Sequence, residues 1–317
     1  MATLDLSRRE FLARAGMLLA MAAMPTQQAA DHSLPAAKTR LILLGTAGGP
    51  RPHKNSFPPS QVILVDGEAY VIDCGNGVAI QLARAGVPLP SLRHVFITHH
   101  HSDHNADYGN LLLLAWASGL QTRVDTWGPP PLARMTRLFF EMDAYDISTR
   151  IADEGRVPLS PLVHPHELTR ETAVMDDGKV SVRCAVVDHP PVQPSFAYRF
   201  DSHDRSIVIS GDTRPSDALI QLAQGADVLV HEALFPSAVD RMVARVSNAT
   251  RLKEAVLRHH TSAEDAGRVA GAAGVKLLVL SHLVPADDPE VSDQMWLDAA
   301  RSTFKGEIIV GKDLLEV

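Results

Sequence analysis

The segment Thr98-His99-His100-His101-Ser102-Asp103-His104 decides how this chain is interpreted. It follows the apolar stretch Val95-Phe96-Ile97, which is typical of a β-strand, and it precedes a Leu-rich stretch that predicts a helix. Its side chains should therefore lie on a loop at the carboxyl end of a strand. Residues two apart in extended backbone share a face, so His99 and His101 can bind one cation while His100 points away.

Asp103 and His104 extend this pattern to a second cation. They lie one turn further along, where the chain bends into the helix, and they can reach an ion next to the first. Imidazole nitrogens combined with carboxylate oxygens suit Zn²⁺, and Mn²⁺ or Fe²⁺ could also be bound. The alternative is a solvated polyhistidine loop, which explains neither the position at a strand end nor the interposed aspartate.

The pattern His-x-His-x-Asp-His after a strand resembles the signature of the metallo-β-lactamase superfamily. The resemblance implies an αββα sandwich with a metal site at the sheet edges, and it covers roughly residues 40–312. Its remaining ligand positions are matched in order by His189 after an apolar strand, by Asp212 in a Ser-Gly-Asp-Thr stretch, and by His282 at the end of a late strand.

The residues themselves support these assignments. His189 and His282 each end an apolar stretch, where a buried sheet delivers side chains to one edge. The carboxylate of Asp212 has two oxygens and can bridge two cations, which one imidazole nitrogen cannot do. The predicted ligands are a first group of His99, His101 and His189, a second group of Asp103, His104 and His282, and Asp212 shared by both.

Further segments resemble ribonuclease Z and its arylsulfatase-like relatives. They are Leu43-Leu44-Gly45-Thr46, Ser210-Gly211-Asp212-Thr213-Arg214-Pro215, Val230-His231-Glu232-Ala233 and His260-Thr261-Ser262. The resemblance implies that His260 faces the leaving group of the substrate, that Glu232 orients it, and that Asp73 positions the ligand loop from behind. Simpler roles are a strand-end cap or ion pair for Glu232 and a polar helix start for His260. His259 is expected to face solvent.

This site predicts a hydrolase. Two cations roughly 3.5–4 Å apart would hold a bridging water and lower its pKa toward neutrality, so that hydroxide attacks the substrate. We expect Asp212, Glu232 and His260 to be the catalytic residues, and phosphodiesters or aryl sulfates to be the first substrates. The alternatives are a lactonase or β-lactamase-like amide hydrolase, and a non-catalytic metal-binding accessory protein.

The composition limits the partners of the chain. Its 317 residues include 30 Lys and Arg against 37 Asp and Glu, a net charge of −7. An acidic chain is a poor fit to broad, phosphate-driven nucleic-acid binding, and the sequence contains no basic, Gly-rich insertion of the kind that clamps tRNA. We therefore expect a small-molecule substrate and no stable nucleic-acid partner, while a homodimer is compatible with the sequence.

Two distant cysteines, Cys74 and Cys184, exclude a disulfide framework.

Residues 1–30 predict an export signal. Arg8 and Arg9 precede the short apolar stretch 15–24, which resembles a twin-arginine signal peptide. That stretch is too short for a transmembrane helix, which needs about 20 residues. We expect cleavage at the end of the signal, a periplasmic protein without membrane attachment, and one hydrolase domain over residues 31–317. An amphipathic N-terminal helix is the alternative.

The remaining pattern predicts an α+β fold with two mixed sheets flanked by helices. Strands gather in each half of the chain with helices between and after them, which favours two packed sheets with outer helices. The pair Asp66-Gly67 predicts a hairpin, and residues 146–175 are predicted to be irregular. The predicted strands are 40–44, 61–65, 69–73, 94–98, 124–127, 179–187, 196–200, 206–210, 228–231, 276–281 and 307–310, and the helices are 78–85, 108–118, 132–142, 218–224, 261–273 and 294–304.

Overall fold

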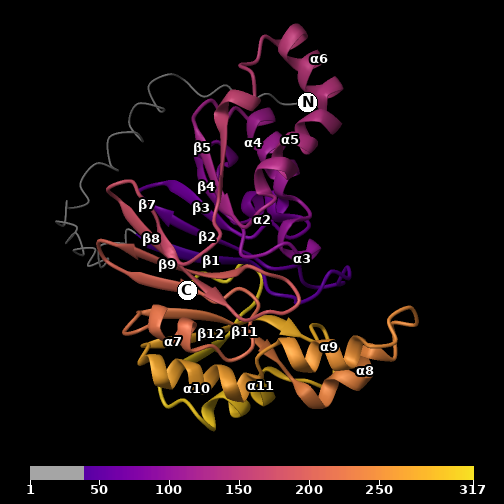
Figure 1. Ribbon diagram of the computed structural model, residues 1–317, viewed down its shortest axis with the longest axis vertical. Coiled ribbons are helices and arrows are strands. Elements are labelled where there is room, and N and C mark those ends of the chain that lie inside the picture. Colours follow the sequence, from indigo (N-terminus) through magenta and orange to yellow (C-terminus); the bar gives the residue numbers. More distant parts are fainter. Residues whose placement is uncertain (1–38) are drawn as a thin grey trace, which may run out of the picture. The chain divides into compact units, whose positions relative to one another are not determined.

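Two β-sheets pack face to face, with helices on their outer sides (Figure 1). The computed structural model describes residues 39–317. The predicted αββα sandwich is confirmed. The predicted signal peptide over residues 1–30 and the predicted start of the domain at residue 31 lie outside the described residues. Within the described part, no helix combines the length and the apolar character that a membrane span requires.

The first sheet contains six strands in the order β1-β2-β3-β4-β5-β6. Its first three strands are antiparallel, and β3 to β6 run parallel. Asp66 and Gly67 form the turn between β2 and β3, with φ angles of 49° and 81°, as a two-residue hairpin of this sequence requires. The strands are β1 (Thr39–Gly45), β2 (Ser60–Val65), β3 (Glu68–Ile72), β4 (Leu92–Phe96), β5 (Val124–Gly128) and β6 (Val163–Glu167).

The second sheet contains seven strands in the order β13-β12-β11-β10-β9-β8-β7. Strands β7 to β10 are antiparallel, and β10 to β13 run parallel. Parallel strands of this kind are buried on both faces, which explains their nearly continuous apolar sequences. The strands are β7 (Thr172–Asp176), β8 (Val180–Val187), β9 (Ser195–Ser202), β10 (Ser206–Ile209), β11 (Val228–Leu234), β12 (Leu277–Val284) and β13 (Glu307–Val310).

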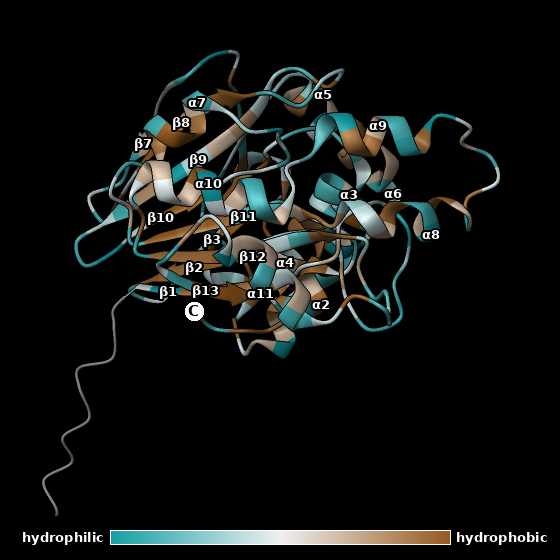
Figure 2. Ribbon diagram, turned by 90° about the horizontal axis from the view of Figure 1, so that it is seen from below, coloured by the Kyte–Doolittle hydropathy of each residue, from teal (hydrophilic) through white to brown (hydrophobic). Residues whose placement is uncertain are grey.

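Helices bury the outer faces of both sheets (Figure 1). Helices α2 and α4 pack on the first sheet, and α7, α10 and α11 pack on the second. The strands are mainly hydrophobic, whereas the helices carry both kinds of residue because one side faces water (Figure 2). The helices are α2 (Val78–Arg84), α3 (Ser102–Asn105), α4 (Tyr108–Ala117), α5 (Leu132–Met142), α6 (Ala144–Glu154), α7 (Asp217–Leu222), α8 (Val239–Val243), α9 (Leu252–His259), α10 (Ala263–Ala273) and α11 (Asp293–Arg301).

The prediction that residues 146–175 are irregular is wrong. This segment contains most of α6, all of β6 and most of β7. Both strands lie at sheet edges, where a proline such as Pro165 is tolerated and the apolar pattern is weak. The short helices α8 and α9 were not predicted either, because neither shows a strong periodic pattern over enough residues.

An aromatic cluster fills the space between the two sheets. Phe96 on β4 is fully buried, and its ring centroid lies 5.4 Å from that of Tyr198 and 5.0 Å from that of Phe200, both on β9. Edge-to-face contacts of this kind stabilise aromatic pairs beyond the area that they bury. This cluster therefore fixes β4, which leads into the histidine-rich loop, against the second sheet.

Replacing Phe96 by alanine should lower the free energy of unfolding by about 3–5 kcal/mol, because the truncation leaves a cavity between the sheets. Urea unfolding followed by circular dichroism measures the loss. The control is Tyr145→Ala on α6, where the side chain is 86% exposed, and it should change the free energy by less than about 0.5 kcal/mol. A comparable small change for Phe96→Ala would contradict this packing.

Candidate metal centre

Strand ends from both sheets meet at one edge of the sandwich. Asp73 directly follows β3, His99 lies in the loop after the neighbouring strand β4, and Asp212 lies in the loop after β10 of the other sheet. The Nε2 atom of His99 and the Oδ2 atom of Asp212 are only 3.8 Å apart. The sheet packing therefore brings together ligand candidates that are more than a hundred residues apart in the sequence.

The first predicted group, His99, His101 and His189, converges on one point. The Nδ1 atom of His101 lies 3.0 Å from Nε2 of His99 and 3.2 Å from Nε2 of His189. Burial is the main cause that lowers the pKa of all three rings, so they are neutral at neutral pH and keep a lone pair for a cation. His100 is turned away, as predicted, and its Nε2 atom contacts the carbonyl of Pro129 at 2.7 Å.

The second predicted group, Asp103, His104 and His282, lies beside the first. The Oδ2 atom of Asp103 is 3.6 Å from Nε2 of His104 and 3.4 Å from Nε2 of His282. All three side chains are buried. One nitrogen or oxygen atom from each of them can reach a common point.

The Asp212 carboxylate lies between the two groups. Its Oδ1 atom is 3.3 Å from Nε2 of His104, and its Oδ2 atom is 3.2 Å from Nε2 of His282. On the other side, Oδ2 is 3.9 Å from Nε2 of His189. A carboxylate placed in this way can bind one cation with each side, which is the bridging role predicted from the sequence.

The donor atoms of the second group fit a divalent cation. Among residues 39–317, the buried atoms without a hydrogen-bond partner include Nε2 of His104, Oδ1 of Asp212 and both ring nitrogens of His282. Leaving such atoms unsatisfied in the interior costs free energy that a cation would recover. Burial lowers the pKa of His282, but Asp212 and Asp103 outweigh it and raise the pKa to about 10, so a positive charge is favoured here.

Polar contacts behind the ligands fix their orientation. The Oδ2 atom of Asp73 accepts a hydrogen bond from Nδ1 of His104 at 2.7 Å, which leaves Nε2 of that ring for the cation. The Oδ1 atom of Asp73 accepts a hydrogen bond from the backbone N–H of Thr98 at 2.8 Å, at the start of the ligand loop. The Nδ1 atom of His189 donates to the carbonyl of His259 at 3.1 Å. Asp73 therefore has the position that the family resemblance implies.

Local backbone irregularities aim the ligands into the site. His282 lies at an interruption of the register between β11 and β12, with Glu232 opposite Ser281 and Ala233 opposite Leu283. Its φ angle is 44°, which is uncommon for a residue other than glycine. A bulge of this kind turns a side chain toward a new direction, here toward the metal centre.

The loop after β1 closes one side of the site. The backbone N–H of Gly49 donates to Oδ2 of Asp103 at 2.9 Å. A Cβ atom on Gly48 would lie 2.7 Å from the ring of His282, so only glycine allows this close approach. The sequence does not reveal this contact, because a Gly-Gly pair alone indicates only a turn.

Glu232, which is buried, and His260, which is half-buried, form a pair next to the metal ligands. The Nδ1 atom of His260 lies 2.7 Å from Oε2 of Glu232 and 3.9 Å from Oδ2 of Asp212. The other carboxylate oxygen of Glu232 accepts a hydrogen bond from the backbone N–H of Thr213. Glu232 thus holds both the imidazole and the loop that carries Asp212. Ser262 caps helix α10, because its side chain accepts a hydrogen bond from the backbone N–H of Asp265.

A cavity of about 420 Å³ opens beside these residues. Its lining includes His101, Asp212 and His260 from the metal centre, Arg51 from the loop after β1, and residues of α8 and α9. His259, which was predicted to face solvent, is half-buried and also lines this cavity. Neither Arg51 nor the two helices were identified from the sequence, because none of them carries a recognisable motif.

Comparison with known proteins identifies the family. Residues 68–283 match the profile described as the beta-lactamase superfamily domain. A protein named ribonuclease Z from Mycobacterium bovis (strain BCG / Pasteur 1173P2) is 36% identical over 280 residues, which cover 87% of this chain and 97% of that protein. The chain belongs to the ribonuclease Z family. A second family member, from Mycobacterium sp. (strain KMS), is 37% identical over 279 residues, with coverage of 87% and 95%.

Solved structures share the fold of this family member. A metallo-beta-lactamase fold protein from Bacillus subtilis has a TM-score of 0.65 and 20% identity, and the alignment covers 88% of this chain and 98% of the other. The short form of human tRNase Z gives the same four values. At this level of identity, the solved structures show the fold alone. The family assignment makes the chain a metal-dependent hydrolase, as predicted.

Replacing Asp212 by alanine should remove both cations, because its carboxylate lies between the two ligand groups. We expect the purified variant to contain less than about 0.2 metal ions per chain by elemental mass spectrometry, and to lose hydrolysis, since both groups then lack a shared anionic ligand. Asp217→Ala in the exposed first turn of α7 is the control and should keep the metal content of the parent protein. Two ions retained in Asp212→Ala would overturn the bridging role.

Proposed function

We propose that the protein is a dinuclear zinc hydrolase of small phosphodiesters, with aryl sulfates as the next substrate class. The observation that carries this proposal is the position of the His260–Glu232 pair, 3.9 Å from the Asp212 carboxylate and open to the cavity. When bound, the cations would supply an activated water and offset the negative charge that develops on the substrate.

His260 is the residue suited to protonate the leaving group. Burial lowers the pKa of His260, but Glu232 and Asp212 outweigh this effect and raise the pKa above its ordinary value. The ring therefore carries a proton more readily than a free histidine does. Because Nδ1 is engaged by Glu232, Nε2 is the atom that can donate a proton to the departing oxygen.

The donor set favours zinc over harder cations. Five imidazoles and two carboxylates surround the site, namely His99, His101, His104, His189, His282, Asp103 and Asp212. Magnesium and calcium prefer sites made mostly of oxygen atoms, whereas a nitrogen-rich site suits Zn²⁺, with Mn²⁺ or Fe²⁺ as alternatives.

Hydrolysis of RNA is the second candidate function. It is favoured by the 36–37% identity to proteins named ribonuclease Z over almost their whole length. Two observations favour small substrates instead. The cavity volume of about 420 Å³ suits a small molecule, and the net charge of the chain is −7.

Export to the periplasm is a separate proposal. It rests on Arg8, Arg9 and the short apolar stretch that follows them. Twin-arginine export carries folded proteins, which would allow the metal centre to form before the chain crosses the membrane. The hydrolytic proposal does not depend on it.

Zinc-loaded protein should hydrolyse bis(p-nitrophenyl) phosphate faster than p-nitrophenyl sulfate, a homoserine lactone, nitrocefin or precursor tRNA, each compared by kcat/KM. A chelator should abolish the activity, and added Zn²⁺ should restore it, because the proposed mechanism relies on the bound cations to activate water. Faster turnover of precursor tRNA would establish the second candidate. Turnover of the lactone or nitrocefin alone would contradict the phosphodiesterase proposal.

His260→Ala should keep both metal ions but slow the release of poor leaving groups. We expect kcat to fall about 10²–10⁴-fold for an alkyl phosphodiester and much less for a p-nitrophenyl ester, whose phenolate leaves without a proton. A series of phosphodiesters with leaving groups of graded acidity measures the difference. Equal slowing across the series would remove His260 as the acid.

A further inference from the structure

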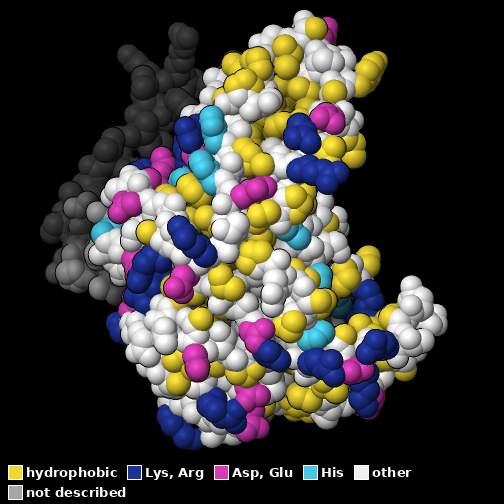
Figure 3. Space-filling view, in the orientation of Figure 1, with side chains coloured by type: hydrophobic (Ala, Val, Ile, Leu, Met, Phe, Trp, Pro, Cys, Tyr) yellow, Lys and Arg dark blue, Asp and Glu magenta, His cyan; other side chains and the backbone are white. Residues whose placement is uncertain are grey.

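The cavity beside the metal centre has two unlike sides. Its floor is polar and consists of metal-ligand candidates such as His101 and Asp103. Helices α8 and α9 form the opposite side, on a projection next to surface histidines (Figures 1 and 3). The mechanism proposed above uses the floor and His260, and gives these two helices no role.

Helices α8 and α9 and their connection present an apolar roof to the cavity. Apart from His259, the residues of 239–259 that line it are all apolar: Met242, Val246, Ala249, Leu252, Ala255 and Val256. The charged residues of α9 pair outside the cavity, as Lys253 does with Asp240 at 2.6 Å. The side of these helices that faces the cavity is thus apolar, although the same cavity is also lined by the candidate metal ligands.

Arg51 supplies a positive charge to the same cavity. Arg51 is half-buried. Burial is the main cause that lowers the pKa of its guanidinium and the charge of the nearby Arg245 is the second, but an arginine stays charged at neutral pH. Within residues 39–317, no carboxylate approaches its guanidinium closely enough to form an ion pair. A cationic side chain in this position can pair with an anionic substrate.

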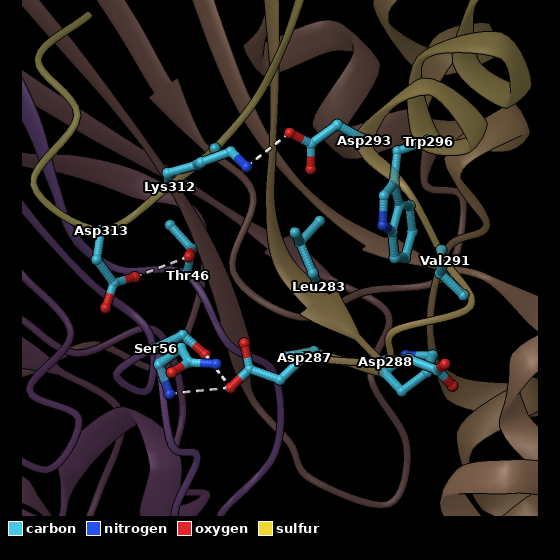
Figure 4. A pocket seen from close by; sticks show the side chains of 14 residues that line it. Thr46, Ser56, Leu283, Asp287, Asp288, Val291, Asp293, Trp296, Lys312 and Asp313 are labelled. Carbon is cyan, nitrogen blue, oxygen red and sulfur yellow. Dashed lines mark hydrogen bonds and ion pairs between the residues drawn. The ribbon is translucent and has the colours of Figure 1, made fainter.

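Carboxylates in a second cavity hold the loop that carries Arg51. Figure 4 shows this cavity, in which Asp287 contacts Ser56 and Asp313 contacts Thr46. The backbone N–H of Phe57 also donates to Asp313 at 2.7 Å. These acidic groups are thus engaged by residues on both sides of Arg51 and hold in place the loop that brings Arg51 to the first cavity.

We propose that the α8–α9 roof selects small anionic esters with an apolar leaving group, an aryl or branched alkyl phosphodiester, and that Arg51 pairs with the phosphate. This inference rests on the proposed function. His260 directly follows α9 and lines the same cavity, so the departing group lies against the roof. The water loses one proton as its oxygen bonds to phosphorus, the bond from phosphorus to the ester oxygen breaks, and the alcohol or phenol leaves with a proton from His260. The proton released by water replaces the one that His260 gave up, and the second product is a phosphate monoester.

Two phosphonates test the roof, because they share one anionic group and differ only in the apolar part. Calorimetry on the zinc-loaded protein should show that phenylphosphonate binds about tenfold more tightly than methylphosphonate. In Leu252→Asn and in Val256→Asn this ratio should fall below about threefold, since an amide replaces the apolar surface of the roof. Leu257→Asn is the control on the same helix, at a side chain that is 40% exposed, and should keep the tenfold ratio.

Arg51→Gln tests the charge separately. It should weaken both phosphonates by a similar factor, about fivefold or more, and leave their ratio unchanged. A ratio near one in the parent protein, or a tenfold ratio that persists in both roof variants, would overturn the proposal. Thermal unfolding of each variant verifies that the fold is intact. The binding measurement does not depend on turnover, so it tests the roof separately from the proposed function. A protein that binds phenylphosphonate more tightly than methylphosphonate but hydrolyses no phosphodiester would refute the proposed function and support the preference of the roof.

Discussion

The strand ends of both sheets are arranged around one buried anion, the carboxylate of Asp212. It is almost inaccessible to water and faces imidazoles from three separate strand ends at 3.2–3.9 Å. Burying such an anion is costly unless positive charge compensates it. The imidazoles of His282 and His104 lower the pKa of Asp212 and provide part of that compensation, and bound cations would add to it. The two sheets therefore place their strand ends around one aspartate. The aromatic core between the sheets and the αββα layering achieve this placement.

Bringing the ligands together requires unfavourable backbone conformations at and near them. His282 adopts a left-handed backbone conformation at a bulge, and Asp73 has a φ angle of 57°. Such conformations cost of order 1–3 kcal/mol each and persist only where neighbouring contacts enforce them. Asp73 is enforced by its hydrogen bonds to Thr98 and His104. Glu232 also fixes the geometry of the site, because its carboxylate contacts both the backbone of the Asp212 loop and the imidazole of the candidate acid His260.

The cavity has one polar side, which carries the candidate metal ligands, and one apolar side, which α8 and α9 form. The floor carries the candidate metal ligands, and the roof of α8 and α9 would exclude water from one side of a bound substrate. Electrostatic interactions strengthen where water is excluded. Arg51 adds the only charge from the loop after β1 that lines the cavity. The proposed function therefore assigns the ester chemistry to the floor of the cavity and the selection of the substrate to its walls.

The sequence by itself determined the fold, the family and the candidate ligands, because His-x-His-x-Asp-His and the later His189, Asp212 and His282 are tied to strand ends by short-range patterns. It could not determine the cavity. The roof comes from short helices that lack a strong apolar period, and Arg51 stands in a loop without a motif. The contact of Gly48 with His282 spans more than two hundred residues. Those features arise from the packing of segments that are distant in the sequence, which no short-range pattern encodes.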